Sequence, residues 1–148
     1  MSKSFVGDGL LYSRDAASRE FLVPTGAHTV MRELALLVSG GSGTTLAARF
    51  AATALESGQV ERLHLVVTGA ASKVLALEMG PGCASARGFR DHLRLDEDLR
   101  RRIQPYTDTD LAAPIASGSH RLHGTVVLPC SAGMVGSLAN GISRGLAQ

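Results

Sequence analysis

The sequence predicts an α/β domain with a parallel sheet, and three observations support that prediction. Short apolar runs stand at residues 34–38, 63–68 and 124–128. Each run is followed at once by a turn of small or polar residues, and each turn leads into a segment with helical spacing of apolar residues. Such runs are typical of strands buried on both faces, and strands that alternate with helices are typical of parallel sheets.

The composition is that of one globular domain. The 148 residues suffice for a domain with its own core, and 45% of them are apolar. A net charge of +2 does not indicate a nucleic acid or an anionic membrane as partner. There is no apolar run of membrane-spanning length and no signal-peptide core in the first 30 residues, so a cytoplasmic protein is the default expectation. The two cysteines, Cys83 and Cys130, predict neither a disulfide framework nor a metal site.

The first strand and its glycine turn organise the chain. Residues 34–38 read Leu-Ala-Leu-Leu-Val, residues 39–43 read Ser-Gly-Gly-Ser-Gly, and Leu46, Phe50 and Ala54 then recur every four residues. Free backbone N–H groups at a helix N-terminus suit a phosphate. The turn lacks the Lys of a Walker loop and the spaced glycines of a dinucleotide fingerprint. A phosphate site and a tight turn without ligand therefore both stay open at this point.

The second strand, residues 63–68, is expected to lie parallel to the first through a right-handed crossover. His64 is interpreted as a hydrogen-bonded core or edge histidine. Thr68 stands at the strand end, where ligands bind in open parallel sheets. Residues 70–79 read as the next helix, with Glu78 near its end, where a lone Glu is usually a solvated surface group.

The middle of the chain is more polar. Residues 83–90 read as a loop and residues 91–103 as one exposed amphipathic helix, which Pro105 stops. A turn at 107–110 and a hydroxyl-rich loop at 114–119 follow. His120 and His123 have i,i+3 spacing, but no other candidate ligand is near in sequence, so no metal site is expected.

The third strand, residues 124–128, leads through a turn at 129–133 into a helix spaced by Met134, Leu138, Ile142 and Leu146. Glycines in that helix favour close packing against another backbone. Residues 1–30 mix glycines and short apolar pieces and are interpreted as an N-terminal extension or arm, so that the folded unit covers residues 31–148. Because parallel strands end at one edge, the three turns are expected to converge on one ligand.

Five segments in register resemble the UbiX-type flavin prenyltransferases, within the wider group of homo-oligomeric flavin-containing Cys decarboxylases. The segments are residues 39–43, 63–68 with 70–71, 77–78, 115–119, and 127–131 with 140–143. The resemblance implies a three-layer Rossmann-like or flavodoxin-like domain that binds FMN. It further implies transfer of a dimethylallyl group from dimethylallyl phosphate to reduced FMN, without a metal, and delivery of prenylated FMN to a UbiD-type decarboxylase.

The resemblance also implies roles for individual residues. Ser42 and Glu78 match positions at the reacting flavin edge and at the prenyl-phosphate site. The residues implied to hold FMN come from all three turns: Gly40, Gly41, Ser42, Thr68, Ser131, Ala132, Gly133 and Met134.

The sequence departs from the family where the family continues past the equivalent of Gln148, with groups that bind the prenyl phosphate and complete the sheet. We therefore expect a C-terminally truncated homologue whose three strands leave an unpaired edge and which forms a homo-oligomer. One alternative is a non-catalytic flavin-binding or assembly protein of the same fold. A flavin-dependent cysteine decarboxylase is the least favoured, because residues 129–134 read Pro-Cys-Ser-Ala-Gly-Met where that branch has Pro-Ala-Ser-Ala-Asn-Thr.

Overall fold

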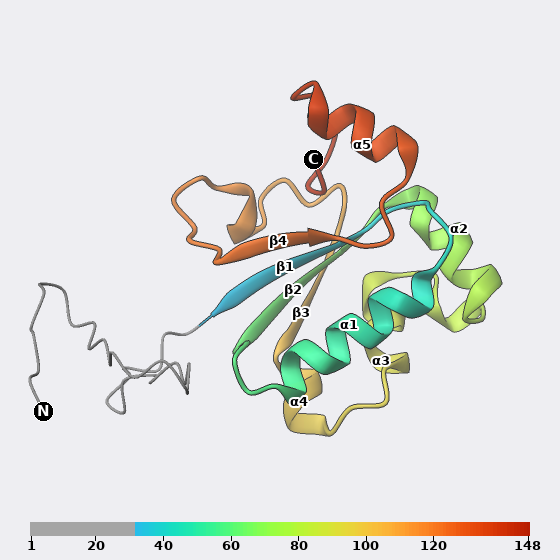
Figure 1. The fold of residues 1–148 in the computed structure, drawn as a ribbon, viewed down its shortest axis with the longest axis vertical. Helices are drawn as coiled ribbons and strands as arrows, with labels where there is room; N and C mark the ends of the chain where they lie inside the picture. Colours follow the sequence, from blue (N-terminus) through green and yellow to red (C-terminus); the bar gives the residue numbers. More distant parts are fainter. Residues whose placement is uncertain (1–31) are drawn as a thin grey trace, which may run out of the picture. The chain divides into compact units, whose positions relative to one another are not determined.

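The computed structural model describes residues 32–148 as an α/β unit (Figure 1). The prediction for residues 1–30 lies outside the described residues. The strands and helices follow one another along the chain as β1 (Glu33–Val38), α1 (Thr44–Glu56), β2 (Arg62–Val67), α2 (Gly69–Glu78), η1 (Pro81–Cys83), α3 (Ala86–His92), α4 (Glu97–Arg101), β3 (Ile103–Thr107), η2 (Pro114–Ala116), β4 (Gly124–Val127) and α5 (Ala132–Ala139). No helix within residues 32–148 is long and apolar enough to cross a membrane.

The four strands form one parallel sheet in the order β3-β2-β1-β4. The chain moves outward from β1 to β2 and β3, and then crosses back so that β4 lies on the other side of β1. That reversal makes the carboxyl ends of β1 and β4 a topological switch point, the place where open parallel sheets bind ligands. The predicted α/β class with a parallel sheet is confirmed.

The two faces of the sheet are covered by different elements, as Figure 1 shows. On one face, α1, α2 and α3 pack over alternate strand residues such as Leu36 and Leu65. Phe89 on α3 is fully buried in the same apolar cluster. The opposite face carries a smaller apolar cluster, in which Ala35 and Leu37 contact Met134 at the start of α5 and Ala147 near the end of the chain. Strand alternation explains the division, since successive side chains point to opposite faces.

Three of the predicted boundaries are wrong. The last helix, expected to extend from Met134 through Leu146, ends at Ala139, and Gly141 follows with φ of 62°. Residues 91–103 do not form one helix: α3 ends at His92, α4 covers only five residues, and Ile103 opens β3. Residues 83–90 are not a loop throughout, because α3 begins at Ala86 after the N-cap Ser85, whose hydroxyl accepts the Gly88 N–H at 3.0 Å. The sheet accordingly has four strands instead of the three expected from the sequence.

Candidate functional site

The glycine turn after β1 lies against the turns that follow β2 and β4. A Cβ built on Gly40 stands 2.7 Å from the Cβ of Ala70 in the first turn of α2. A Cβ built on Gly41 stands 3.3 Å from the Cβ of Pro129 and 3.5 Å from the backbone N of Ser131. The backbone therefore approaches both neighbours where glycine allows it. The three turns meet, as the sequence predicts.

A buried hydroxyl joins the turns after β1 and β4. Ser39, which is 1% exposed, donates its hydroxyl to the carbonyl of Pro129 at 2.8 Å and accepts the N–H of Ser131 at 2.8 Å. The backbone N–H of Ser39 donates to the same Pro129 carbonyl at 3.2 Å. These bonds fix the start of α5 against the glycine turn, and sequence reasoning did not assign Ser39 that task.

Two of the predicted ligand hydroxyls cap helices. The Thr68 hydroxyl accepts the Ala71 N–H at 3.2 Å at the start of α2. The Ser131 hydroxyl accepts the Met134 N–H at 3.3 Å at the start of α5. Each hydroxyl satisfies one backbone donor that the helix itself leaves free. The other N–H groups of these first turns are the donors available for an anion.

The N-terminus of α1 already binds a carboxylate. Glu78 accepts the N–H of Gly43 at 3.0 Å, and the N–H and hydroxyl of Thr44 at 2.8 and 2.7 Å. The Thr44 hydroxyl, and then the backbone N–H groups of Gly43 and Thr44, lower the pKa of Glu78. Gly43 precedes the helix with φ of 94°, in the left-handed region that favours glycine. The glycine turn thus presents hydrogen-bond donors to an anion, and here that anion is the carboxylate of Glu78.

The remaining predicted residues divide by exposure. Ser42 is exposed in the glycine turn, and Ala132 and Gly133 are exposed at the start of α5. Met134 is only 4% exposed, and its side chain packs in the apolar cluster with Ala35 and Leu37. The side chain is therefore not free to contact a ligand at the turns. No Cβ built on Gly69 or Gly133 would meet another atom within 4 Å, so space is open before α2 and α5.

The other histidine predictions can also be placed. His64 is buried, and its imidazole hydrogen-bonds Tyr106 and Glu33, which confirms its interpretation as a hydrogen-bonded core histidine. His120 and His123 do not act as a pair. His120 contacts the Glu33 side chain, whereas the Nδ1 of His123 accepts the Glu33 backbone N–H at 3.3 Å.

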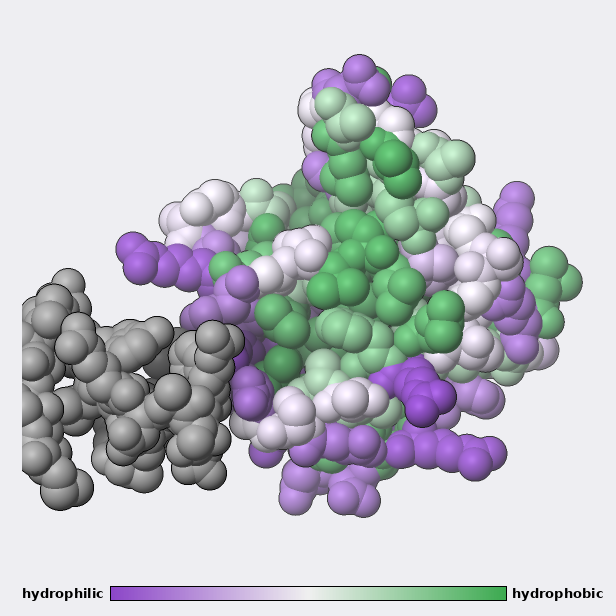
Figure 2. Space-filling view, viewed as in Figure 1, coloured by the Kyte–Doolittle hydropathy of each residue, from purple (hydrophilic) through white to green (hydrophobic). Residues whose placement is uncertain are grey.

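An apolar surface borders the convergent turns. Leu46 on α1 is 58% exposed, Leu77 on α2 is 86% exposed, and Val135 on α5 is 52% exposed. In the view of Figure 2, apolar residues gather over the middle of the described part of the chain, with hydrophilic residues along much of the rim. Backbone donors beside apolar side chains suit a ligand that combines an anionic group with a flat, weakly polar body.

Comparison with known proteins identifies the family. The Flavoprotein family model matches residues 24–148. A flavin prenyltransferase UbiX from Deinococcus radiodurans is 37% identical over 109 residues, which are 74% of this chain and 49% of that protein. The flavin prenyltransferase UbiX of Thermoplasma acidophilum is 33% identical over 106 residues, 72% of this chain and 50% of that protein. The chain spans about half the length of the curated relatives it matches.

A solved structure shares the fold. The crystal structure of a dodecameric FMN-dependent UbiX-like decarboxylase from Escherichia coli superposes with a TM-score of 0.58 and 25% identity, over 77% of this chain and 55% of that one. The flavodoxin-like α/β fold is therefore shared with a flavin-dependent protein. With the family model covering most of its length, the chain belongs to the Flavoprotein family.

Proposed function

We propose that this chain binds FMN at the three convergent turns and takes part in flavin prenylation. The proposal is that a dimethylallyl group passes from dimethylallyl phosphate to reduced FMN, and that the product serves a UbiD-type decarboxylase. Its relatives of about one third identity are named flavin prenyltransferases. The observation that carries the proposal is the meeting of three glycine-rich or hydroxyl-rich turns at the switch point between β1 and β4.

The residues present fit such a cofactor. Open space in front of Gly69 and Gly133 leaves room beside the first turns of α2 and α5. The N-termini of these helices favour a phosphate through free N–H groups and through the helix dipole. We assign the phosphate end of FMN to this part of the site, and the ring system to the exposed turn that carries Ser42.

The proposed reaction places two demands on the chain. It needs donors that hold a leaving phosphate, and it needs an apolar wall that keeps water from an allyl group with carbocation character. FMN itself supplies the nucleophilic ring when bound. We propose that Ser42 and the backbone N–H groups beside it orient the reactants, and that Leu46, next to them on α1, supplies apolar surface.

Glu78 has a defined place in this proposal. Its carboxylate holds Gly43 and Thr44, so it shapes the turn that carries Ser42. An incoming phosphate at this helix would have to displace Glu78 or bind beside it. We therefore assign Glu78 to positioning the turn, and Ser42 to contact with the ligands.

The first test is an FMN titration of the full chain, followed by quenching of flavin fluorescence. We expect saturable binding that weakens in Ser42→Ala and remains in the matched variant Ser57→Ala, which lies at the opposite end of α1. The second test incubates the chain with reduced FMN and dimethylallyl phosphate without oxygen, and measures the flavin mass. FMN bound without any heavier flavin product would refute prenyl transfer, and no saturable FMN binding would refute the whole proposal.

One observation favours a second function. The carboxylate of Glu78 already satisfies the first donors of α1, which is one of the anion sites that prenyl transfer needs. Flavin binding without catalysis needs the three turns for FMN and no second anion site at the N-terminus of α1. We propose further that the chain forms a homo-oligomer, since the related Escherichia coli structure is dodecameric. Light scattering at micromolar concentration tests this, and a monomer would contradict it.

A further inference from the structure

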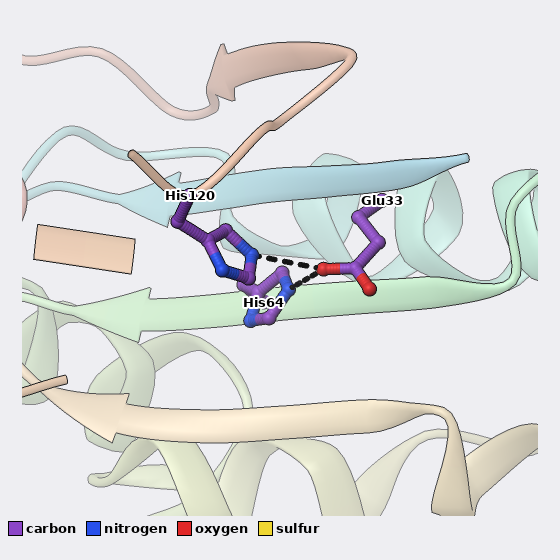
Figure 3. A group of neighbouring side chains, drawn as sticks. All are labelled: Glu33, His64 and His120. Atoms are coloured by element: carbon purple, nitrogen blue, oxygen red, sulfur yellow. Dashed lines mark hydrogen bonds and ion pairs between the residues drawn. The ribbon is translucent and has the colours of Figure 1, made fainter. Parts of the chain in front are cut away.

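A cluster of metal-ligand type lies away from the convergent turns, at the opposite end of β1. It is formed by Glu33, His64 and His120, and Figure 3 shows the three side chains pointing toward one another from β1, β2 and the loop before β4. Glu33 lies six positions before Ser39, which is about 20 Å of extended chain. The cluster is therefore separate from the site proposed for FMN.

The contact atoms converge on one point. The Nε2 atoms of His64 and His120 lie 2.8 and 2.9 Å from the same carboxylate oxygen of Glu33. The three ligand atoms all lie within 4.8 Å of one another, and the two imidazole rings are 86° apart. Ligand atoms around a tetrahedral zinc ion, with bonds of about 2.0–2.2 Å, are about 3.4 Å apart. A small rotation of the Glu33 side chain would lengthen its distances to the two imidazoles to that spacing.

The surrounding residues hold these ligands in place. His64 is 2% exposed, stacks on Tyr106 with ring centroids 5.8 Å apart, and has its Nδ1 3.1 Å from the Tyr106 hydroxyl. The His120 loop is fastened to Glu33 by two bonds through His123: the His123 N–H donates to the Glu33 carbonyl at 2.9 Å, and the Glu33 N–H donates to His123 Nδ1. The donors are thus fixed before any ion arrives.

The protonation chemistry also suits a metal. Without an ion, each imidazole donates an Nε2 proton to Glu33, because a carboxylate only accepts. Coordination needs the Nε2 lone pair, so that proton must move to Nδ1. On His64 the Tyr106 hydroxyl stands ready to accept it, which is the outer hydrogen bond typical of metal-bound histidines.

We propose that Glu33, His64 and His120 form a binding site for a divalent transition metal of the zinc class. Two imidazoles and one carboxylate are a known zinc ligand set, with a fourth position left for water. With side-chain exposures of 20% for Glu33 and 26% for His120, an ion can reach the site from solvent. The ion would tie β1, β2 and the 117–123 loop together, and the inference does not depend on the proposed function.

The test is a Zn²⁺ titration of the full chain by calorimetry, in a Cys130→Ser background that removes the exposed thiol. We expect one Zn²⁺ per chain, with affinity at least tenfold weaker in His120→Ala and Glu33→Gln. His92→Ala, an exposed histidine on α3, is the matched control and should bind as the parent does. Since His120 lies in a loop, its variant should fold, and circular dichroism verifies this.

A second variant separates ligation from mere stability. Tyr106→Phe keeps all three ligands but loses the outer hydrogen bond to His64, so it should keep the stoichiometry and lose about tenfold in affinity. Cobalt(II) absorption in the visible range, which reports the ligand geometry, should change in His120→Ala and not in His92→Ala. Absence of saturable Zn²⁺ binding, or equal binding by the parent and His120→Ala, would overturn the proposal. The cluster would then only join its three segments by hydrogen bonds.

Discussion

Gly40→Ala tests whether the contact between the glycine turn and α2 holds the site together. The added Cβ would stand 2.7 Å from the Cβ of Ala70 and 3.3 Å from its carbonyl carbon. Carbon atoms in good contact are about 3.5–4.0 Å apart. The turn and the start of α2 must therefore separate by about 1 Å, and both are backbone. Overpacking of this kind costs about 1–3 kcal/mol in the free energy of unfolding.

Urea denaturation of the full chain measures the effect. We expect the midpoint for Gly40→Ala to fall while the slope with denaturant stays unchanged, because the surface exposed on unfolding is the same. Gly69→Ala is the matched control, since a Cβ there meets nothing within 4 Å and the position opens α2. Alanine has the higher helix propensity, so this control should be neutral or more stable by up to about 1 kcal/mol.

A double-mutant cycle locates the cause. Ala70→Gly removes the opposing Cβ and leaves the carbonyl carbon, so the pair Gly40→Ala with Ala70→Gly should recover part of the lost stability. The coupling expected for residues in contact is about 0.5–3 kcal/mol. Stability of Gly40→Ala equal to that of Gly69→Ala would refute the close approach. Strictly additive effects in the double variant would show that the loss arises elsewhere.

Three further predictions concern single side chains. Ser39→Ala removes a buried hydroxyl and leaves the part-buried Ser131 N–H without its acceptor, so it should lower the free energy of unfolding by about 1–3 kcal/mol in urea denaturation. Ser42→Ala, at an exposed position, should show no such loss. Hydrogen bonds lower the pKa of Glu78 from its ordinary value of 4.5, so the ionised carboxylate stabilises the fold above that pH and the effect is lost as pH falls through the folded pKa. Glu78→Gln should therefore flatten the acid side of a profile of unfolding free energy against pH, measured below pH 4.5. An unchanged profile would contradict the contact. Cys130 is exposed, whereas Cys83 is buried and burial raises the pKa of its thiol, so one thiol per folded chain should react rapidly with Ellman's reagent, and Cys130→Ser should abolish that phase.

The fold was predictable where one local rule decides it. The runs that form β1, β2 and β4 are apolar and bounded by turn residues, and all three appear in the structure near their expected bounds. Strand β3 was missed because it reads Ile-Gln-Pro-Tyr-Thr, and Pro105 ordinarily argues against a strand. Among the strands of residues 32–148, β3 is an end strand that pairs with β2 alone, and an edge tolerates a residue without an N–H.

The site was predictable only in part, for a different physical reason. The convergence of the three turns follows from parallel strands, so the turn residues themselves could be named. The contact between Glu78 and Thr44 joins residues 34 positions apart, and the contact between His120 and Glu33 joins residues 87 positions apart. Spacing along the chain carries no signal for such pairs. The i,i+3 spacing of His120 and His123 gave no sign of Glu33, although both histidines contact that residue in the structure.

The hold of Glu78 on the start of α1 has a consequence for how the chain folds. The amides of Gly43 and Thr44 belong to a helix N-terminus, where hydrogens ordinarily exchange with solvent rapidly. Here they are protected only once β2 has docked and the last residue of α2 has reached them. Their exchange rates would thus report completion of the whole strand–helix–strand–helix unit, which the amides within α1 do not report. Glu78→Ala, which removes both acceptor oxygens, would release that protection at two amides while leaving the interior of α1 slow to exchange.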